Sequence, residues 1–162
     1  MDTRRKILSR EELRRELARR REGGARIVLA NGCFDVLHAG HIRYLEGAER
    51  EGDLLVVAIN SDASERRLKG AARPFLPQQA RAELVAALAA VDYVVVFDEP
   101  NVEALLTELR PDVHAKGTDY TPETVPERDT ARRLGTHVAI VGDPKQHSTS
   151  DLIARVRGRG GA

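Results

Sequence analysis

Cysteine is almost absent from this sequence, with Cys33 the one example in 162 residues. A single thiol excludes an internal disulfide framework and a zinc site built from several cysteines, and it suits a reducing compartment. Cys33 follows an apolar run, so we expect it to pack at the end of a strand. The alternative is a reactive thiol, which would require a lowered pKa.

Long apolar runs and an excess of charge are also missing. No stretch approaches the ~20 apolar residues that span a bilayer, and residues 1–17 lack the apolar core of a signal peptide. The 26 Lys and Arg residues nearly balance the 25 Asp and Glu residues. Overall charge therefore gives no reason to expect binding to nucleic acid or to a membrane, and we expect a cytoplasmic protein.

Short runs of Val, Ile and Leu alternate with helical patterns along a chain long enough for one domain. This alternation predicts an α/β fold, a Rossmann-like parallel sheet with helices on both faces and right-handed crossovers. The apolar runs are at 26–34, 53–60, 93–97, 112–116 and 137–142. The helical patterns are at 10–22, 41–51, 77–90, 101–109 and 127–134, with shorter stretches opening at Ser61 and near Ser148.

The two ends differ from the rest of this single domain, which we expect to cover residues 1–162. Residues 1–24 read as an N-terminal helical extension, in which Ser9 and Glu12 form a capping box. Glutamates interrupt its arginines, which favours a solvated face over a nucleic-acid patch. Glycines predict a flexible tail at 158–162.

The stretch from Ile27 to His41, IVLANGCFDVLHAGH, predicts a phosphate site. A β-branched run breaks at Asn31, and His38-Ala39-Gly40-His41 precedes a helix. Gly40 allows a ligand to approach the backbone, while the helix offers unpaired N–H groups and the positive end of its dipole. The two imidazoles add donors near neutral pH. The alternative is a pair of loop histidines that only cap the helix or pack.

These residues resemble the HxGH motif of the nucleotidyltransferase superfamily. The longer string NGCFDVLHAGHIRYL is similar to the adenylyltransferase domain of ADP-heptose synthesis, which joins AMP to D-glycero-β-D-manno-heptose 1-phosphate. Similar strings follow in order at 60–70, 73–81, 110–123 and 147–153. The resemblance implies ATP as substrate, Mg²⁺ with it, a phosphorylated small molecule as acceptor, and a homo-oligomer.

The resemblance also implies roles for single residues. His38, His41 and Lys69 would be catalytic, with both imidazoles on the triphosphate and Lys69 on a phosphate of the acceptor or the triphosphate. The residues implied to bind the nucleotide are Asn31, Gly32, Cys33, Phe34, Gly40, Lys116, Gly117, Asp119, Tyr120, His147, Ser148 and Thr149. Those implied to bind the acceptor are Asp35, Lys69 and Arg73, and no protein ligands to a metal are expected.

Several of these residues have a structural alternative. Asp35 either helps to hold Mg²⁺ through phosphate or water, or fixes its loop by accepting backbone N–H bonds. Lys69 could be a surface lysine. Arg81 lies on an alanine-rich helix, where a solvated or salt-bridged arginine is as reasonable as an anion ligand. His147 stands where relatives typically carry arginine, and an imidazole is only conditionally charged; Lys145 is a candidate to compensate.

The chemistry implied needs no enzyme nucleophile, because a phosphate oxygen of the acceptor attacks the α-phosphorus and expels pyrophosphate. Alignment and charge stabilisation are then the protein's task. The function expected is transfer of AMP from ATP to a sugar 1-phosphate. The alternatives are a cytidylyltransferase for a small alcohol phosphate such as glycerol 3-phosphate, and a nucleotide-binding regulatory module without turnover.

Overall fold

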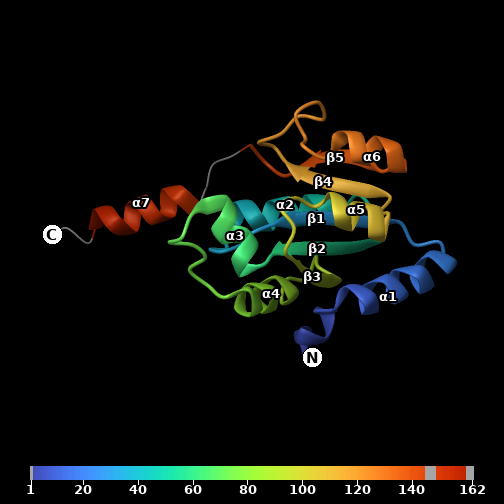
Figure 1. Cartoon of the computed structure of the whole chain (residues 1–162), viewed down its shortest axis with the longest axis horizontal. Helices are drawn as coiled ribbons and strands as arrows, with labels where there is room; N and C mark the ends of the chain where they lie inside the picture. The colour runs from blue at the N-terminus through green and yellow to red at the C-terminus, as the bar shows by residue number, and fades with distance from the viewer. Residues whose placement is uncertain (1, 145–148, 160–162) are drawn as a thin grey trace.

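A five-stranded parallel sheet forms the centre of the molecule (Figure 1). The structure, a computed structural model, describes residues 2–144 and 149–159. The strands are β1 (Ile27–Gly32), β2 (Leu54–Asn60), β3 (Tyr93–Phe97), β4 (Val113–Gly117) and β5 (His137–Val141). Their order in the sheet is β3-β2-β1-β4-β5. The predicted Rossmann-like parallel sheet is confirmed, and each strand lies within one residue of a predicted apolar run or inside it.

Helices connect the strands, as the alternating pattern predicts. They are α1 (Arg10–Glu22), α2 (Ala39–Glu49), α3 (Asp62–Lys69), α4 (Gln78–Ala86), α5 (Glu103–Leu109), α6 (Arg128–Leu134) and α7 (Thr149–Arg159), with a short 3-10 helix η1 at Thr3–Lys6. The largest difference from prediction is at the end of α4, which stops at Ala86 instead of 90. The helix α2 begins at Ala39 instead of 41, so that His38 is its N-cap residue.

The two faces of the sheet bury separate apolar clusters, as expected for a sheet covered on both sides. On one face, α2 and α4 pack through residues such as Leu45 and Val85. On the other face, α1 and α5 pack through residues such as Leu17 and Leu105. The strands are buried on both sides, which explains why they read as continuous apolar runs.

The N-terminal segment is part of the domain core. The predicted capping box between Ser9 and Glu12 is present, and Leu13 and Leu17 are fully buried. Before α1, Ile7 pairs with Val94 as an isolated parallel bridge. Residues 2–24 therefore do more than extend the fold, because they cover one edge and one face of the sheet.

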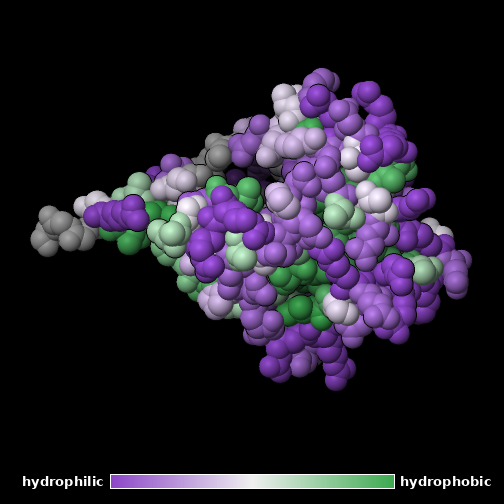
Figure 2. Space-filling model, viewed as in Figure 1, coloured by the Kyte–Doolittle hydropathy of each residue, from purple (hydrophilic) through white to green (hydrophobic). Residues whose placement is uncertain are grey.

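The C-terminal helix differs from expectation. Gly158 and Arg159, placed in a flexible tail by the sequence prediction, belong to α7. Figure 1 shows α7 projecting from the sheet, and Figure 2 shows hydrophobic colour along it against a mainly hydrophilic face. Val156 on this helix is 73 % exposed. Among the described residues, no helix is long and apolar enough to cross a membrane.

The carboxyl end of the sheet is where the chain reverses its winding direction. β1 lies between β2 and β4: the crossover after β1 leads to β2 on one side, and the crossover after β3 returns the chain to β4 on the other side. Open α/β sheets bind ligands in the crevice at such a switch point. α2 packs closely against the residue that follows β5: a Cβ on Gly47 of α2 would lie 3.0 Å from the backbone nitrogen of Gly142. Glycine at 47 thus lets α2 approach the end of β5.

Candidate active site

A cavity of about 400 Å³ opens at the carboxyl ends of β1 and β4. Its lining includes residues from four segments: the loop between β1 and α2 (residues 33–38, the phosphate loop), the end of α3, the loop after β4 and the start of α7. The predicted residues that line it are Asn31, Gly32, Cys33, Phe34, His38, Gly40, His41, Lys69, Lys116, Gly117, Asp119, Tyr120 and Thr149. Most of the predicted site therefore comes together in one place.

The two histidines of the HxGH string form a stacked pair at the start of α2. Their ring centroids are 3.8 Å apart with an interplanar angle of 25°. His38 is the N-cap residue, and its backbone carbonyl accepts a hydrogen bond from the backbone N–H of His41. Its side chain makes no capping bond, so the imidazole is not used to cap the helix. Two imidazoles and the first turn of α2 thus share one edge of the cavity.

Burial keeps His41 neutral. Burial, together with the smaller effects of the neighbouring His38 and Lys69, lowers the pKa of His41 to about 4. Phe34 covers the other side of the ring, with centroids 5.2 Å apart. The Nδ1 atom of His41 is buried and has no hydrogen-bond partner among the described residues. An anion bound beside His41 would favour the protonated imidazolium and so raise the pKa of this ring.

The backbone between β1 and α2 is held in an unusual conformation. Phe34 has a φ of 51°, which non-glycine residues rarely adopt. A Cβ on Gly32 would lie 3.0 Å from the Phe34 ring, so a larger residue there would require this ring to shift. Cys33 packs as predicted, with Sγ 3.7 Å from Oδ1 of Asn60. Burial raises the pKa of its thiol to about 11, which argues against a reactive thiolate.

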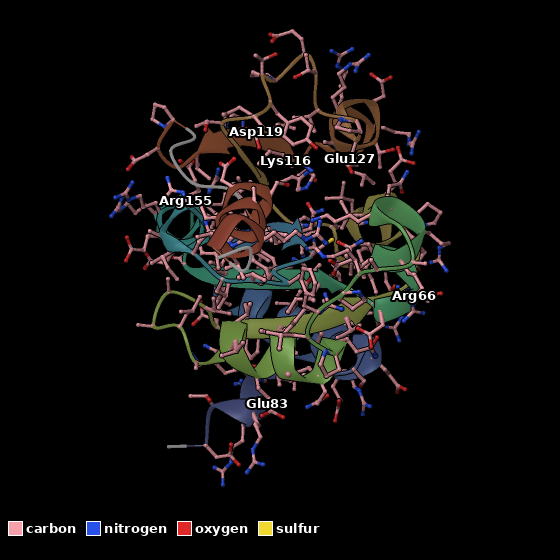
Figure 3. The ribbon with its side chains drawn as sticks, turned by 90° about the vertical axis from the view of Figure 1, so that its left-hand side faces the viewer. Arg66, Glu83, Lys116, Asp119, Glu127 and Arg155 are labelled. Carbon is pink, nitrogen blue, oxygen red and sulfur yellow. The ribbon has the colours of Figure 1, made fainter. Side chains whose placement is uncertain are left out.

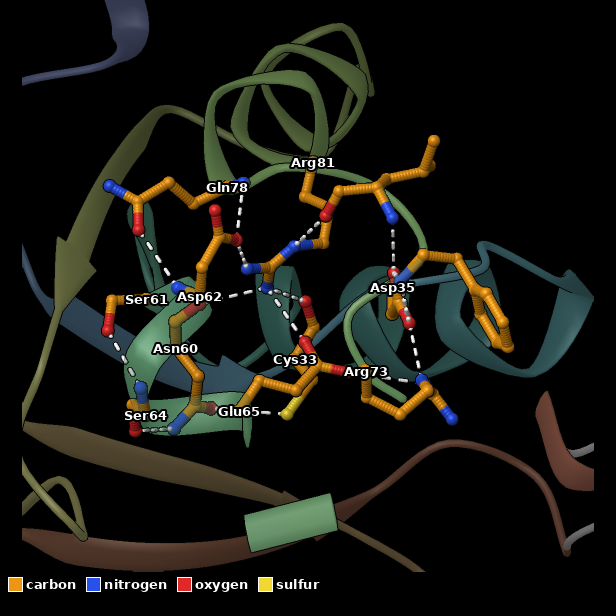
Figure 4. A network of polar contacts seen from close by, with 12 residues as sticks. Cys33, Asp35, Asn60, Ser61, Asp62, Ser64, Glu65, Arg73, Gln78 and Arg81 are labelled. Atoms are coloured by element: carbon orange, nitrogen blue, oxygen red, sulfur yellow. Dashed lines mark hydrogen bonds and ion pairs between the residues drawn. The ribbon is translucent and has the colours of Figure 1, made fainter. Parts of the chain in front are cut away.

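A buried ionic network contacts the loop between β1 and α2 and holds its backbone in place (Figure 4). Arg81 is fully buried and donates to the backbone carbonyls of Cys33, at 2.6 Å, and Asn60, at 2.8 Å. Its guanidinium also pairs with Asp62 at 2.8 Å and Glu65 at 3.1 Å. Of the two alternatives for Arg81, the structure shows the salt-bridged one. It links the ends of β1 and β2 to α3.

Asp35 and Arg73 belong to the same network and do not line the cavity. Arg73 bridges Asp35, at 2.6 Å, and Glu65, at 3.2 Å. Asp35 also accepts backbone N–H bonds from Phe75 and Leu76 at 2.8 to 2.9 Å. The structure therefore places these two predicted acceptor ligands in supporting contacts, since their charges are directed at each other. Asp35 fixes a loop, although the loop is 73–76 instead of its own.

Lys69 is the last residue of α3, and it reaches the cavity from an exposed position. Gly70 follows it with a φ of 96°, which ends the helix in a conformation that favours glycine. Among the described residues, no carboxylate forms a salt bridge with Lys69. Its ammonium group is therefore available to an anion at the same edge as His38 and His41.

The β4 side of the cavity carries a different set of polar groups. Lys116 is only 6 % exposed, and its Nζ lies 3.5 Å from a carboxylate oxygen of Glu127 (Figure 3). The same Nζ lies 3.5 Å from Oδ1 of Asn31 and 4.7 Å from the centroid of the Tyr120 ring. Oδ1 of Asn31 is also 3.1 Å from Nε2 of the buried His114. Asn31 and Lys116 are thus held by residues behind the cavity wall.

Sequence reasoning missed several residues that line the cavity. The lining residues outside the predicted set are Arg43, Tyr44, Asn60, Thr118, Val141, Gly142, Asp143, Pro144 and Ser150. Arg43 and Tyr44 follow His41 within the first two turns of α2, so helical spacing from the histidines was the available signal. The predicted nucleotide ligands His147 and Ser148, and Lys145, lie outside the described residues. The described residues contain no group of three or more His, Cys, Asp or Glu side chains placed to hold a metal.

A family model described as cytidylyltransferase-like matches residues 29–155, most of the chain. The chain belongs to the cytidylyltransferase-like family. The match confirms the family resemblance of the HxGH string, and it includes the whole cavity.

Relatives of this cytidylyltransferase-like domain include several proteins named bifunctional protein HldE. The chain is 49 % identical to the protein of that name from Syntrophotalea carbinolica over 154 residues, which cover 95 % of this chain and 31 % of the relative. It is 47 % identical to the one from Pelobacter propionicus over 151 residues, 93 % of this chain and 31 % of the relative. The chain thus spans about a third of the length of these relatives.

A solved structure supports the fold independently. The crystal structure of the lipopolysaccharide core biosynthesis protein from Thermoplasma volcanium GSS1 superposes with a TM-score of 0.64 at 26 % identity. The superposition covers 75 % of this chain and 100 % of that chain.

Proposed function

We propose that this domain transfers AMP from ATP to a sugar 1-phosphate, D-glycero-β-D-manno-heptose 1-phosphate, and releases pyrophosphate. The observation that carries the proposal is the stacked His38 and His41 pair at the start of α2, inside a cavity that also receives Lys69. The identity of 49 % with a bifunctional HldE protein and the similarity of the longer motif to the heptose branch support this acceptor.

The reaction is an in-line displacement at the α-phosphorus. An oxygen of the acceptor phosphate forms the new P–O bond, the bond to the β-phosphate breaks, and its electron pair leaves with pyrophosphate. No protein nucleophile is needed, so the site's task is to position two polyanions and to stabilise charge. Mg²⁺ belongs to the substrate, because triphosphate oxygens are its usual ligands.

Each basic group has a role in this scheme. His38 and His41 donate hydrogen bonds to triphosphate oxygens, where negative charge accumulates as pyrophosphate leaves. Lys69 binds the acceptor phosphate or the triphosphate at the same edge of the cavity. Asp35, Arg73 and Arg81 hold the loop in place without touching substrate. The first turn of α2 adds backbone N–H groups.

The experiment is a pyrophosphate-release assay with ATP and CTP, each combined with heptose 1-phosphate, glucose 1-phosphate and glycerol 3-phosphate. The proposal predicts release with ATP and heptose 1-phosphate. Release with CTP and glycerol 3-phosphate alone would make the domain a cytidylyltransferase for an alcohol phosphate. A domain that binds ATP but releases nothing with any acceptor would be a regulatory module.

Location and assembly belong to the same proposal. The single cysteine suits the reducing cytoplasm, and the balanced charge gives no reason to expect nucleic acid or a membrane as a partner. The family resemblance supports a homo-oligomer, which light scattering on the purified protein tests directly.

A further inference from the structure

Two buried polar groups lie behind the β4 wall of the cavity, and binding of phosphate gives neither of them a role. His114 is fully buried on β4, and Glu127 is 4 % exposed at the N-cap of α6. Neither lines the cavity. Each contacts a residue that does: His114 contacts Asn31, and Glu127 contacts Lys116. Burying a polar ring and a carboxylate is costly, so their contacts need a reason.

The contacts determine which way the Asn31 amide points. An ammonium group can only donate, so the atom of Asn31 that faces Lys116 must be its oxygen. The same oxygen faces Nε2 of His114 at 3.1 Å, so Nε2 must carry the proton. Burial lowers the pKa of His114 to about 3, which keeps the ring neutral with Nδ1 bare. Nδ2 of Asn31 is then left without a hydrogen-bond partner among the described residues.

Lys116 is a donor of a different kind from Lys69. The carboxylate of Glu127 lies 3.5 Å from Nζ, in an ion pair without a hydrogen bond, and offsets the lysine's charge, whereas Lys69 has no such partner among the described residues. A neutralised ammonium group attracts a phosphate less than an unpaired one, but it still donates a directed hydrogen bond. The Tyr120 ring, 4.7 Å from Nζ, restricts it further. The charge pattern therefore separates a phosphate end, at Lys69, from a neutral end at Lys116.

We infer that His114 and Glu127 are positioning residues that aim two donors, Nδ2 of Asn31 and Nζ of Lys116, at a neutral acceptor atom on the nucleoside part of the substrate. The inference rests on the proposed use of a nucleoside triphosphate. It adds that nucleoside recognition depends on two residues that never touch the ligand. His114 acts by fixing the Asn31 amide, and Glu127 by fixing and neutralising Lys116.

The test compares a ligand that has a nucleoside with one that lacks it. Dissociation constants for ATP and for inorganic tripolyphosphate are measured by calorimetry on the wild type, His114→Phe and His114→Gln. The phenylalanine ring fills the space without donating, whereas the glutamine amide can still donate to Asn31. His137→Phe is the matched control, because His137 is an exposed histidine on the adjacent strand β5.

We expect His114→Phe to weaken ATP binding about tenfold, the effect of losing roughly one well-placed hydrogen bond, and to leave tripolyphosphate binding unchanged. His114→Gln should recover part of the ATP affinity, and the control should match the wild type. Because both ligands bind the same preparation, the ratio of their affinities is insensitive to the folded fraction.

Two results would overturn the inference: an equal loss for both ligands, or no loss for ATP. If His114→Phe does not fold, Glu127→Gln serves in its place, because it keeps the side-chain shape and removes the neutralising charge. The inference then predicts that tripolyphosphate binds more tightly relative to ATP, and an unchanged ratio contradicts it. A wild-type protein that binds tripolyphosphate but no nucleotide would instead refute the proposed function.

Discussion

The stacked imidazoles of His38 and His41 illustrate how single side chains in this site depend on their surroundings. His41 is neutral in the free protein because it is buried beside another imidazole and near Lys69. A triphosphate would supply the negative charge that these groups lack. Binding and charge on the histidines are thus coupled, and the site is suited to a polyanion more than to a neutral ligand.

We predict that His38→Ala and His41→Ala each lower kcat by about 10² or more, because removing one charge-stabilising donor costs roughly 3 kcal/mol in the transition state. Steady-state pyrophosphate release measures the effect. His137→Ala, at an exposed position, should retain full activity. Unchanged kcat in soluble, folded His41→Ala protein would mean that the His41 imidazole has no role in the reaction.

Buried histidines also predict a pH dependence of stability. The pKa values of His41 and His114 are lowered to about 4 and about 3, so between these values and the unfolded value near 6.5 only the unfolded chain binds the protons. Their contribution to stability is complete above about pH 6.5 and is lost as the pH falls. Urea unfolding from about pH 7 to about pH 4.5 should show this loss.

The His114→Phe variant measures how much of this pH dependence of stability comes from His114. Its free energy of unfolding should depend less steeply on pH in that window than that of the wild type, by about one proton taken up on unfolding. Parallel curves for the two proteins would mean that His114 titrates normally in the folded state.

At the scale of elements, α3 carries two functions on neighbouring turns. Glu65 and Asp62 face the buried Arg81, while Lys69 at the end of the helix faces the cavity. The helix is therefore anchored by its ion pairs with Arg81, and its last residue lies at the cavity. The arrangement ties the position of Lys69 to the ionic network in Figure 4.

We predict that Lys69→Ala raises the KM for the phosphorylated acceptor or for ATP at least tenfold, with little change in thermal stability, because an exposed lysine contributes little to folding. Arg66→Ala is the control, since Arg66 is exposed on the same helix. Substrate titrations of both variants measure the effect. Identical KM values for Lys69→Ala and wild type would mean that Lys69 is a solvated surface lysine that does not bind substrate.

Arg81 should behave in the opposite way. We predict that Arg81→Leu destabilises the protein by about 3 to 5 kcal/mol, because it leaves Asp62 without its cation and leaves the fully buried Glu65 with Arg73 alone. Thermal melting measures this loss, which corresponds to a decrease of roughly 10 °C for a domain of this size. Arg132→Leu, at an exposed position on α6, should melt near the wild type. A normal melting temperature for Arg81→Leu would show that the network adds no net stability.

At the scale of the whole molecule, the sequence was sufficient to predict the sheet and the place of the site. Buried parallel strands read as apolar runs, and parallel strands bring their carboxyl ends to one edge. Asn31 and Lys116 could therefore be expected to meet, although 85 positions separate them. Local signals such as the Ser9 capping box were also reliable, because they depend on neighbouring residues only.

Partner choice was harder to predict. Asp35 and Arg73 carry charges that suit a ligand equally well, and only the fold shows that they pair with each other. Glu127, the N-cap residue of α6, contacts Lys116, and no spacing in the sequence predicts this contact. The fate of a buried charge depends on which opposite charge the tertiary structure brings to it. Patterns along the chain do not contain that information.

Direct observation of AMP transfer tests the central claim most directly. The purified domain is incubated with ATP, Mg²⁺ and D-glycero-β-D-manno-heptose 1-phosphate, and products are followed by phosphorus NMR, with His41→Ala as the matched control. The proposal predicts ADP-heptose and pyrophosphate in equal amounts, formed about 10² times more slowly by the variant. ATP that binds but yields no ADP-heptose, or equal rates for the two proteins, would contradict it.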